Sequence, residues 1–472
     1  MSKILVWLHS DLRLLDNPAL YHAAQQGEVI PIYVLNDRTP GDYSLGGAQK
    51  WWLHQAIKSL AASFSKYGIN LILARGRSSE TIARTAQELG VSAVYSNKVY
   101  EPHLIREAEL LETSLQGLGI EFKKFHSYLL FEQEKVRNNS GSFFKVFTPF
   151  WRHCLNTLAQ PQIPLPLPKF IKSSGSYKSD TLTDWKLLPL KPNWAGGLEA
   201  RWAISEDAAH NSLYDFIENK LNGYALGRDF PATNSCSYLS PYLHFGMISP
   251  GQVWYEVTRA GHTKNINTER FLAELGWREF SYHTLCNFPQ LPQKPYRAEF
   301  ENFPWDYNSE HLSAWQRGET GIPIVDAGMR ELWQTGFMHN RIRMIVASFL
   351  TKNLLIHWKK GAEWFWDTLV DADLANNSAN WQWVAGSGTD ASPYFRIFNP
   401  VLQGEKFDPD GAYVKKYVPE LVEVSPRFIH KPWKLEKGVI LQYYPKPIVD
   451  LKVTRDVALQ AYKKMKKSLN AT

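Results

Sequence analysis

Residues 3–35 read KILVWLHSDLRLLDNPALYHAAQQGEVIPIYVL, two apolar runs with a helical pattern between them. The runs Ile4–Leu8 and Val29–Leu35 have the length and composition of buried strands, and Pro18–Gln26 is typical of a helix. Strand patterns recur at 71–74 and 91–95, and helical patterns at 47–67, 79–89 and 102–118. Short buried strands that alternate with amphipathic helices indicate a parallel sheet with right-handed crossovers. We therefore predict an α/β, Rossmann-like domain over residues 1–130.

The loop after the first strand lacks the usual dinucleotide signature. The strand leads into HSDLRLLDNP instead of G-x-G-x-x-G, so the glycines that bring a backbone close to a pyrophosphate are missing. The shape of this domain therefore does not define its ligand.

The chain changes character twice after residue 130. Residues 157–205 contain four closely spaced prolines (161, 164, 166, 168), followed by SSGSYKSD, and such a stretch cannot hold a regular helix. We predict a surface linker over residues 131–205. From residue 206 to 472 apolar residues recur at helical spacing, for example over 208–221, 250–259, 268–285, 323–335, 339–358 and 361–369. This pattern predicts a second, larger all-α domain.

Composition narrows the class of protein. The chain has 472 residues, too long for one compact domain, and a formal net charge of +7, which favours a polyanionic partner. Nine of its 18 tryptophans fall within residues 277–383, and large rings of this kind can simply build a core. No apolar run approaches a membrane span, the start lacks a signal-peptide pattern, and three scattered cysteines suit neither a disulfide framework nor a metal site. A cytoplasmic protein is expected.

Two stretches of the helical half carry polar residues in patterns that suit a ligand. In YALGRDFPATNSCSYLSPYLHFG (224–246), Ser240-Pro241 predicts a helix start, and the hydroxyl residues before it could bind phosphate; a plain capped helix is the alternative. In FLAELGWREFSYH (271–283), Glu274, Trp277, Arg278 and Ser281 are spaced to share one arc. They suit a planar ligand near phosphate, or an exposed Glu274–Arg278 pair.

Two later stretches add a charged pair and an asparagine-rich turn. In GFMHNRIRMIVASFL (336–350), Asn340, Arg343, Met344 and Ala347 share a face, while Arg341 points elsewhere; surface arginines are the alternative. Residues 368–400 contain Asp371, which can pair with Arg343, then Asp373 and three asparagines (376, 377, 380) that can orient a heterocycle, unless this is only a polar loop. Trp381 and Trp383 would point the same way in a strand and different ways in a helix.

Several reaction classes lack their motifs. The sequence has no HExxH, no CxxC pair, no P-loop and no GxSxG. Hydrolytic and metal chemistry are therefore disfavoured, and a bound organic cofactor is expected to supply the reactivity.

These four stretches, in this order after a Rossmann-like domain, resemble the photolyase/cryptochrome family of blue-light flavoproteins. The shared motifs are LSPYLHFG, LGWREF, HNRIRM, DADL…NWQW and RIFNP, and the similarity runs from LVWLHSDLRLLDNPAL to QGEKFDPDGAYVKKYVPEL at 403–421. Within the family the chain is most similar to bacterial cyclobutane pyrimidine dimer (CPD) photolyases, with FWDTLVDADL also similar to the photolyases nearest to plant cryptochromes.

The resemblance implies an FAD, active in its reduced form, inside the helical domain. The implied FAD contacts are Tyr224, Cys236, Ser237, Tyr238, Leu239, Ser240, Phe271, Arg343, Asp371, Ala372, Asp373 and Asn377. Of these, Asn377 would face flavin N5, and Cys236 and Tyr238 depart from the family's usual threonine and basic residue. Glu274, Asn340 and Asn377 are the implied catalytic residues, and Trp305, Trp358 and Trp381 match the electron-transfer chain.

The same resemblance implies a DNA substrate. Glu274, Trp277, Asn340, Met344 and Trp383 would line the lesion pocket, and Arg278, Arg341, Arg396 and Gln403 would lie near the DNA backbone. The expected activity is light-driven repair of CPDs flipped out of UV-damaged DNA, single- or double-stranded, by a monomer in the bacterial cytoplasm, near the nucleoid. Asn377 resembles the repair enzymes, because plant cryptochromes tend to have Asp there, and residues 338–341 lack the paired histidines of (6-4) photolyases.

Two functional alternatives and one cofactor remain open. A cryptochrome-like photosensor without repair would use the same FAD site, whereas a light-independent flavin oxidoreductase has no nicotinamide motif to support it. Residues 100–103 lack the Asn-Glu pair of the best-known folate antenna site. A second, antenna chromophore is therefore left as a folate, a deazaflavin, another flavin or none.

Overall fold

The computed structural model describes residues 2–158, 161–173, 175, 177–261, 265–435 and 443–469. The chain packs as two compact units. The first unit comprises residues 1–144, 148–222 and 237–289, and the second comprises 145–147, 223–236 and 290–472. The predicted boundaries at 130 and 205 follow the sequence pattern and do not coincide with the limits of these units. Parts of the predicted linker (159, 160, 174, 176) and of the predicted helical domain (262–264, 436–442, 470–472) lie outside the described residues.

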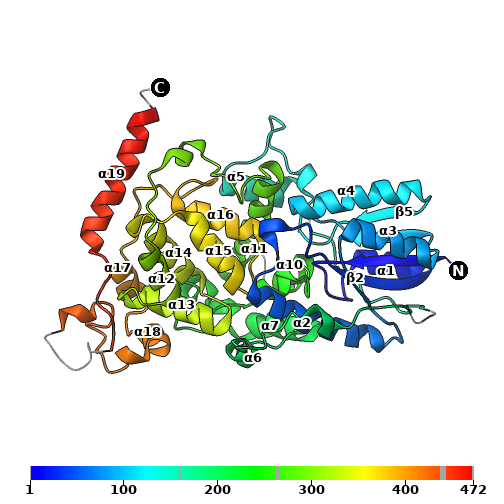
Figure 1. The fold of residues 1–472 in the computed structure, drawn as a ribbon, viewed down its shortest axis with the longest axis horizontal. Helices are drawn as coiled ribbons and strands as arrows, with labels where there is room; N and C mark the ends of the chain where they lie inside the picture. Colours follow the sequence, from blue (N-terminus) through cyan, green and yellow to red (C-terminus); the bar gives the residue numbers. More distant parts are fainter. Residues whose placement is uncertain are drawn as a thin grey trace. The chain divides into compact units, whose positions relative to one another are not determined.

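The first unit contains the predicted parallel sheet (Figure 1). Its strands are β1 (Lys3–Leu8), β2 (Glu28–Leu35), β3 (Ile72–Arg75), β4 (Ala93–Asn97) and β5 (Glu121–Phe125), in the order β3-β2-β1-β4-β5. All four strand pairings are parallel, so the α/β prediction is confirmed. The sequence pattern did not predict β5, because EFKKF is an edge strand with no buried residue and therefore no apolar run.

The loop after β1 has a structural role that accounts for its unusual sequence. Asn97, at the end of β4, donates from Nδ2 to Asp11 at 2.6 Å and to Asn17 at 2.8 Å. Asn17 in turn caps α1 (Pro18–Gln26) by accepting from the Leu20 amide. Buried Arg13 donates to the Gly246 carbonyl at 2.9 Å. The polar residues of HSDLRLLDNP thus bind one another and the protein backbone.

The remaining helices follow the predicted pattern in most places. The first unit has α2 (Gly47–Ser65), α3 (Ser78–Leu89), α4 (Pro102–Gly117), most of α5 (Phe147–Thr157), α6 (Gly196–Arg201), α7 (Glu206–Asn219), α9 (Ser240–His244), α10 (Pro250–Gly261) and α11 (Ile266–Asn287). The second has α8 (Tyr224–Gly227), α12 (Ser309–Arg317), α13 (Pro323–Thr335), α14 (Asn340–Ser348), α15 (Trp358–Thr368), α16 (Leu374–Ala385), α17 (Pro400–Phe407), α18 (Ala412–Tyr417) and α19 (Leu451–Leu469). None of the helices described here is long and apolar enough to cross a membrane.

The single helix predicted over 339–358 is wrong. Helix α14 ends at Ser348 and passes into a π-helical turn, η6 (Phe349–Asn353). Leu355 then adopts a positive φ of 54°, and α15 begins anew at Trp358 with the His357 side chain as its cap. Apolar residues continue on both sides of the break, so the periodicity did not reveal it.

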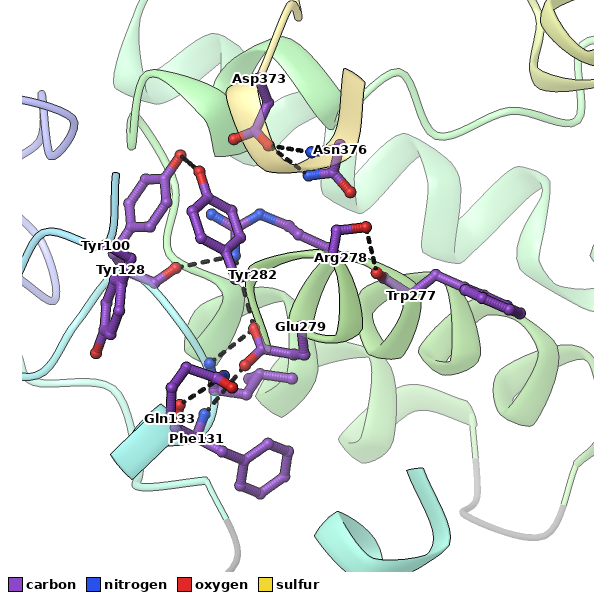
Figure 2. A network of polar contacts seen from close by, with 12 residues as sticks. Tyr100, Tyr128, Phe131, Gln133, Trp277, Arg278, Glu279, Tyr282, Asp373 and Asn376 are labelled. Atoms are coloured by element: carbon purple, nitrogen blue, oxygen red, sulfur yellow. Dashed lines mark hydrogen bonds and ion pairs between the residues drawn. The ribbon is translucent and has the colours of Figure 1, made fainter. Parts of the chain in front are cut away.

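A buried polar network anchors α11 within the first unit (Figure 2). The Glu279 carboxylate is fully buried and accepts from the backbone amides of Leu130 at 3.0 Å and Phe131 at 3.2 Å. The neighbouring Arg278 donates to the Tyr128 carbonyl at 2.9 Å, with its guanidinium 4.4 Å from the centre of the Tyr128 ring. Burial raises the pKa of Glu279 from 4.5 to about 7.

The raised pKa of Glu279 predicts a pH-dependent stability. Between pH 4.5 and about 7 the unfolded carboxyl loses its proton while the native one keeps it, so the free energy of unfolding should fall with rising pH and level off above 7. Glu279→Gln, which does not titrate, should lose this part of the pH dependence. Urea unfolding across that window would show it, and equal slopes for both proteins would contradict the assignment.

Candidate functional site

An ion pair joins two elements of the second unit. The Nη2 atom of Arg343, on α14, lies 2.8 and 3.0 Å from the two carboxylate oxygens of Asp371, in the loop between α15 and α16. Its Nε donates to the Met338 carbonyl at 2.7 Å. The Asp371 side chain is 3% exposed and that of Arg343 is 25% exposed. The predicted pairing is therefore present, and the guanidinium remains open on one side.

Asp373, two residues after Asp371, directly precedes the first residue of α16. Its carboxylate accepts from the Asn376 amide at 2.8 Å and from Asn376 Nδ2 at 2.7 Å, which makes it the N-cap. One position further, Asn377 donates from Nδ2 to the Ala362 carbonyl of α15 at 3.0 Å. Because a carbonyl only accepts, this bond orients the amide, and Oδ1 of Asn377 accepts no hydrogen bond from the described residues. The cap and the α15 contact thus leave one amide oxygen available.

The helical state of α16 settles the orientation of its two tryptophans. Trp381 and Trp383 are two positions apart in a helix and so point different ways: Trp381 is buried and Trp383 half-buried. The Trp381 ring lies 5.0 Å from the ring of Phe365 on α15. A Cβ at Gly361 would collide with the Trp381 indole, so α15 can pass this ring only because residue 361 is glycine.

The three predicted electron-transfer tryptophans share one part of the second unit. Trp358 and Trp381 belong to the same buried cluster, and Trp305 packs against it. The His357 ring lies between two of them, 5.0 Å from Trp305 and 5.5 Å from Trp358. His357 and Phe365 were not predicted, and no motif in the sequence distinguishes them from ordinary core residues.

Helix α11 carries Glu274, Trp277 and Arg278, and the prediction that Arg278 lies near the DNA backbone is wrong. Glu274 and Trp277 are half-buried, whereas Arg278 is buried and bound to the Tyr128 carbonyl. Figure 2 shows the Trp277 and Arg278 side chains leaving the helix in opposite directions. Positions 274, 277, 278 and 281 fall within about 100° of one another on the helix, as the spacing predicts, but Trp277 and Arg278 lie at the two edges of this arc and their side chains turn apart. Arg278 anchors the helix and is not placed to contact a DNA backbone.

The other residues predicted to contact DNA differ in whether their side chains are paired, exposed or half-buried. Arg341 is paired with Asp229 at 2.7 Å, a partner that the sequence did not predict. Arg396 is exposed, and its guanidinium makes no hydrogen bond or ion pair within the described residues. Gln403 is half-buried on α17. In the lesion-pocket set, Asn340 is exposed at the start of α14, and Met344 is half-buried one turn later.

The stretch predicted to bind phosphate is divided between the units. Tyr224 and Cys236 belong to the second unit, and Ser237 to Ser240 belong to the first, with Phe271. Helix α9 begins at Ser240, so the predicted helix start is confirmed, but Leu239 is its N-cap and no side chain caps it, so an N-cap role for the Ser240 hydroxyl is wrong. Phe271 packs against Phe216, with 4.4 Å between ring centres. Ala372, like Asp371 and Asp373, is buried in the second unit.

Comparisons with known proteins cover nearly the whole chain. Residues 4–169 match the family profile described as DNA photolyase, and residues 271–464 match the FAD binding domain of DNA photolyase. The chain is 46% identical over 477 residues to the deoxyribodipyrimidine photo-lyase of Agrobacterium fabrum, covering 99% of each. It is 34% identical over 498 residues to cryptochrome-2 of Arabidopsis thaliana, covering 98% of this chain and 78% of that protein. A solved bacterial class III photolyase from Agrobacterium tumefaciens superimposes with a TM-score of 0.94 and 45% identity over 99% of this chain and 98% of that one.

The residues present fit the cofactor that these matches imply. The edge of a flavin ring presents hydrogen-bond donors and acceptors side by side. In the second unit, Oδ1 of Asn377 is an available acceptor, and Nη1 of Arg343, which makes no hydrogen bond within the described residues, is an available donor. With both profiles, a full-length relative and a full-length structure in agreement, this chain belongs to the DNA photolyase family and is an FAD-binding enzyme of DNA repair.

Proposed function

We propose that this enzyme repairs cyclobutane pyrimidine dimers by light-driven electron transfer from reduced FAD. Bound, reduced FAD would supply one photoexcited electron to the cyclobutane ring and take it back once the ring has split into two pyrimidines, so the repair is redox-neutral and needs no water or metal. The observation that carries the proposal is the amide of Asn377, whose nitrogen is engaged by Ala362 and whose oxygen is left as an acceptor.

The orientation of Asn377 favours the reduced state of the cofactor. In reduced flavin the N5 atom carries a hydrogen, and Oδ1 of Asn377 would accept a hydrogen bond from it. An amide has no titratable proton, so this acceptor stays the same across the physiological pH range. The Arg343–Asp371 pair would hold the polar edge of the same ring, with Nη1 as the donor.

The proposed lesion contacts combine polar and aromatic side chains. Glu274 would hydrogen-bond the base edges, and Asn340 would add a neutral donor and acceptor. Trp277 and Trp383 would provide flat apolar walls on which unstacked bases rest, with Met344 filling space beside them. The half-buried state of Trp277 and Trp383 supports this, because each leaves part of its ring accessible.

A photosensor without repair activity is the second candidate. The 34% identity to a plant cryptochrome and the tryptophan cluster around Trp358 support it, since both features suit photoreduction of a flavin. Asn377 argues for repair, because photosensors of the plant type tend to carry an aspartate there. The two candidates differ in whether a lesion is split.

The repair assay decides between these functions. The purified enzyme, with its FAD fully reduced, should restore thymines in UV-irradiated oligothymidylate under blue light and leave them unchanged in the dark. Glu274→Gln should retain FAD and repair about tenfold more slowly, because a hydrogen bond to a charged acceptor is replaced by a weaker one to a neutral acceptor. Absence of repair by the reduced wild-type enzyme would refute the proposal, and loss of FAD from the variant would show that Glu274 serves the cofactor.

Replacing Trp381 tests the electron-transfer assignment. Trp381→Phe keeps an aromatic ring beside Phe365 but is harder to oxidise, so photoreduction of oxidised FAD should become much slower while repair by chemically reduced enzyme is retained. Trp315→Phe is the matched control, because Trp315 is buried in the same cluster 6.2 Å from Trp381 and lies outside the predicted chain. If the two variants slow photoreduction equally, Trp381 has only a packing role.

A further inference from the structure

A buried lysine lies beneath the segment that carries Arg396. Lys352 belongs to the π-helical turn η6, and only 1% of its surface is exposed. Its Nζ atom donates to the backbone carbonyl of Arg396 at 3.1 Å and lies 5.3 Å from the centre of the Tyr394 ring. Lys352 and both residues that it contacts belong to the second unit. Tyr394 and Arg396 lie in the segment 392–398, which forms neither helix nor strand.

Burying the Lys352 ammonium group in this position costs free energy. No carboxylate forms an ion pair with it in the described part of the chain, and the nearby charge is the like charge of Arg396. Burial, and then the charge of Arg396, lowers the pKa of Lys352 to about 7. A methionine could fill the same space without this desolvation cost. Packing alone therefore does not explain a lysine here.

The segment is also held by contacts with Phe303 and with helix α19. The Tyr394 ring stacks on Tyr462 of α19, with 4.8 Å between ring centres and an angle of 11°. It also contacts Phe303, at 5.2 Å between ring centres. Next to Lys352 in the same turn, Asn353 donates to Thr454 of α19 at 2.9 Å. The backbone at 394–396 is thus fixed by buried groups, while the Arg396 guanidinium stays exposed and has no ion-pair partner among the described residues.

We propose that Lys352 is a positioning residue for DNA binding, which fixes the backbone of Arg396 so that its guanidinium is presented to a DNA phosphate. The inference rests on the proposed function, in which Arg396 contacts the DNA backbone. The hydrogen bond from Nζ removes the freedom of an irregular segment, and a guanidinium held in place loses less entropy when it binds phosphate. Phosphate contacts of this kind orient a protein on DNA without reading its sequence.

The steady-state kinetics of Lys352→Met test this role. The KM for UV-damaged oligonucleotide should rise up to about fivefold, the range of one exposed ion pair, while kcat and FAD content stay unchanged. The melting temperature should hold or rise, because a buried charge has been removed. Lys360→Met, which removes an exposed lysine of α15 in the same unit, is the charge-matched control and should leave KM unchanged. A lower kcat at unchanged KM would show a purely structural role and overturn the proposal.

A double mutant separates this inference from the proposed function. If Lys352 acts only through Arg396, Lys352→Met should raise KM no further in an Arg396→Ala background. Additive effects, or a normal KM for Lys352→Met beside a raised KM for Arg396→Ala, would overturn the positioning role and leave the DNA contact intact. A normal KM for Arg396→Ala would show that Arg396 does not contact the DNA backbone. If Lys352→Met does not fold, Lys352→Gln replaces it, because its side chain is uncharged and one bond shorter and so weakens the contact with the Arg396 carbonyl.

Discussion

The ion pair between Arg343 and Asp371 holds together the part of the second unit in which the proposed chemistry lies. It connects α14 to the loop before α16, and Asp373, two residues along that loop, caps α16. The position of Asn377 on α16 follows from that cap and from its bond to Ala362. Breaking the pair would remove the positive charge of Arg343 from beside a nearly buried carboxylate, a large cost compared with the stability of a domain.

The interruption after α14 gives the second unit its functional geometry. If α14 continued without a break, Lys352 and Trp358 would lie on one helix, and the directions of their side chains would be fixed by its regular repeat. The π turn and the positive φ of Leu355 instead allow α15 to begin in a new direction at Trp358. Lys352 lies inside that turn and Trp358 just beyond the break, so one irregularity positions both the residue that holds the Arg396 backbone and a member of the tryptophan cluster.

The three arginines predicted to contact DNA show that charge alone does not identify a nucleic-acid contact. Arg278 is buried against Tyr128 and supports α11, and Arg341 is neutralised by Asp229. Arg396 keeps its charge exposed, because a buried neighbour holds its backbone and no carboxylate in the described part of the chain pairs with the guanidinium. The net charge of +7 favours a polyanionic partner in general. Which arginine remains available to bind it depends on the groups that each one contacts in the tertiary structure.

The sequence by itself determined the parallel sheet, most helices and the Arg343–Asp371 pairing, because these depend on apolar periodicity and on complementary charges in recognisable motifs. Its motifs also identified the family. The edge strand β5, the break after α14 and the burial of Arg278 were decided only by the tertiary structure. In each case the local pattern was compatible with more than one conformation. The contacts that decide between these conformations come from elsewhere in the chain. Strand β4 pairs with β5, Asp306 forms a parallel bridge with Ile356 just beyond the break after α14, and Tyr128 accepts the hydrogen bond of Arg278.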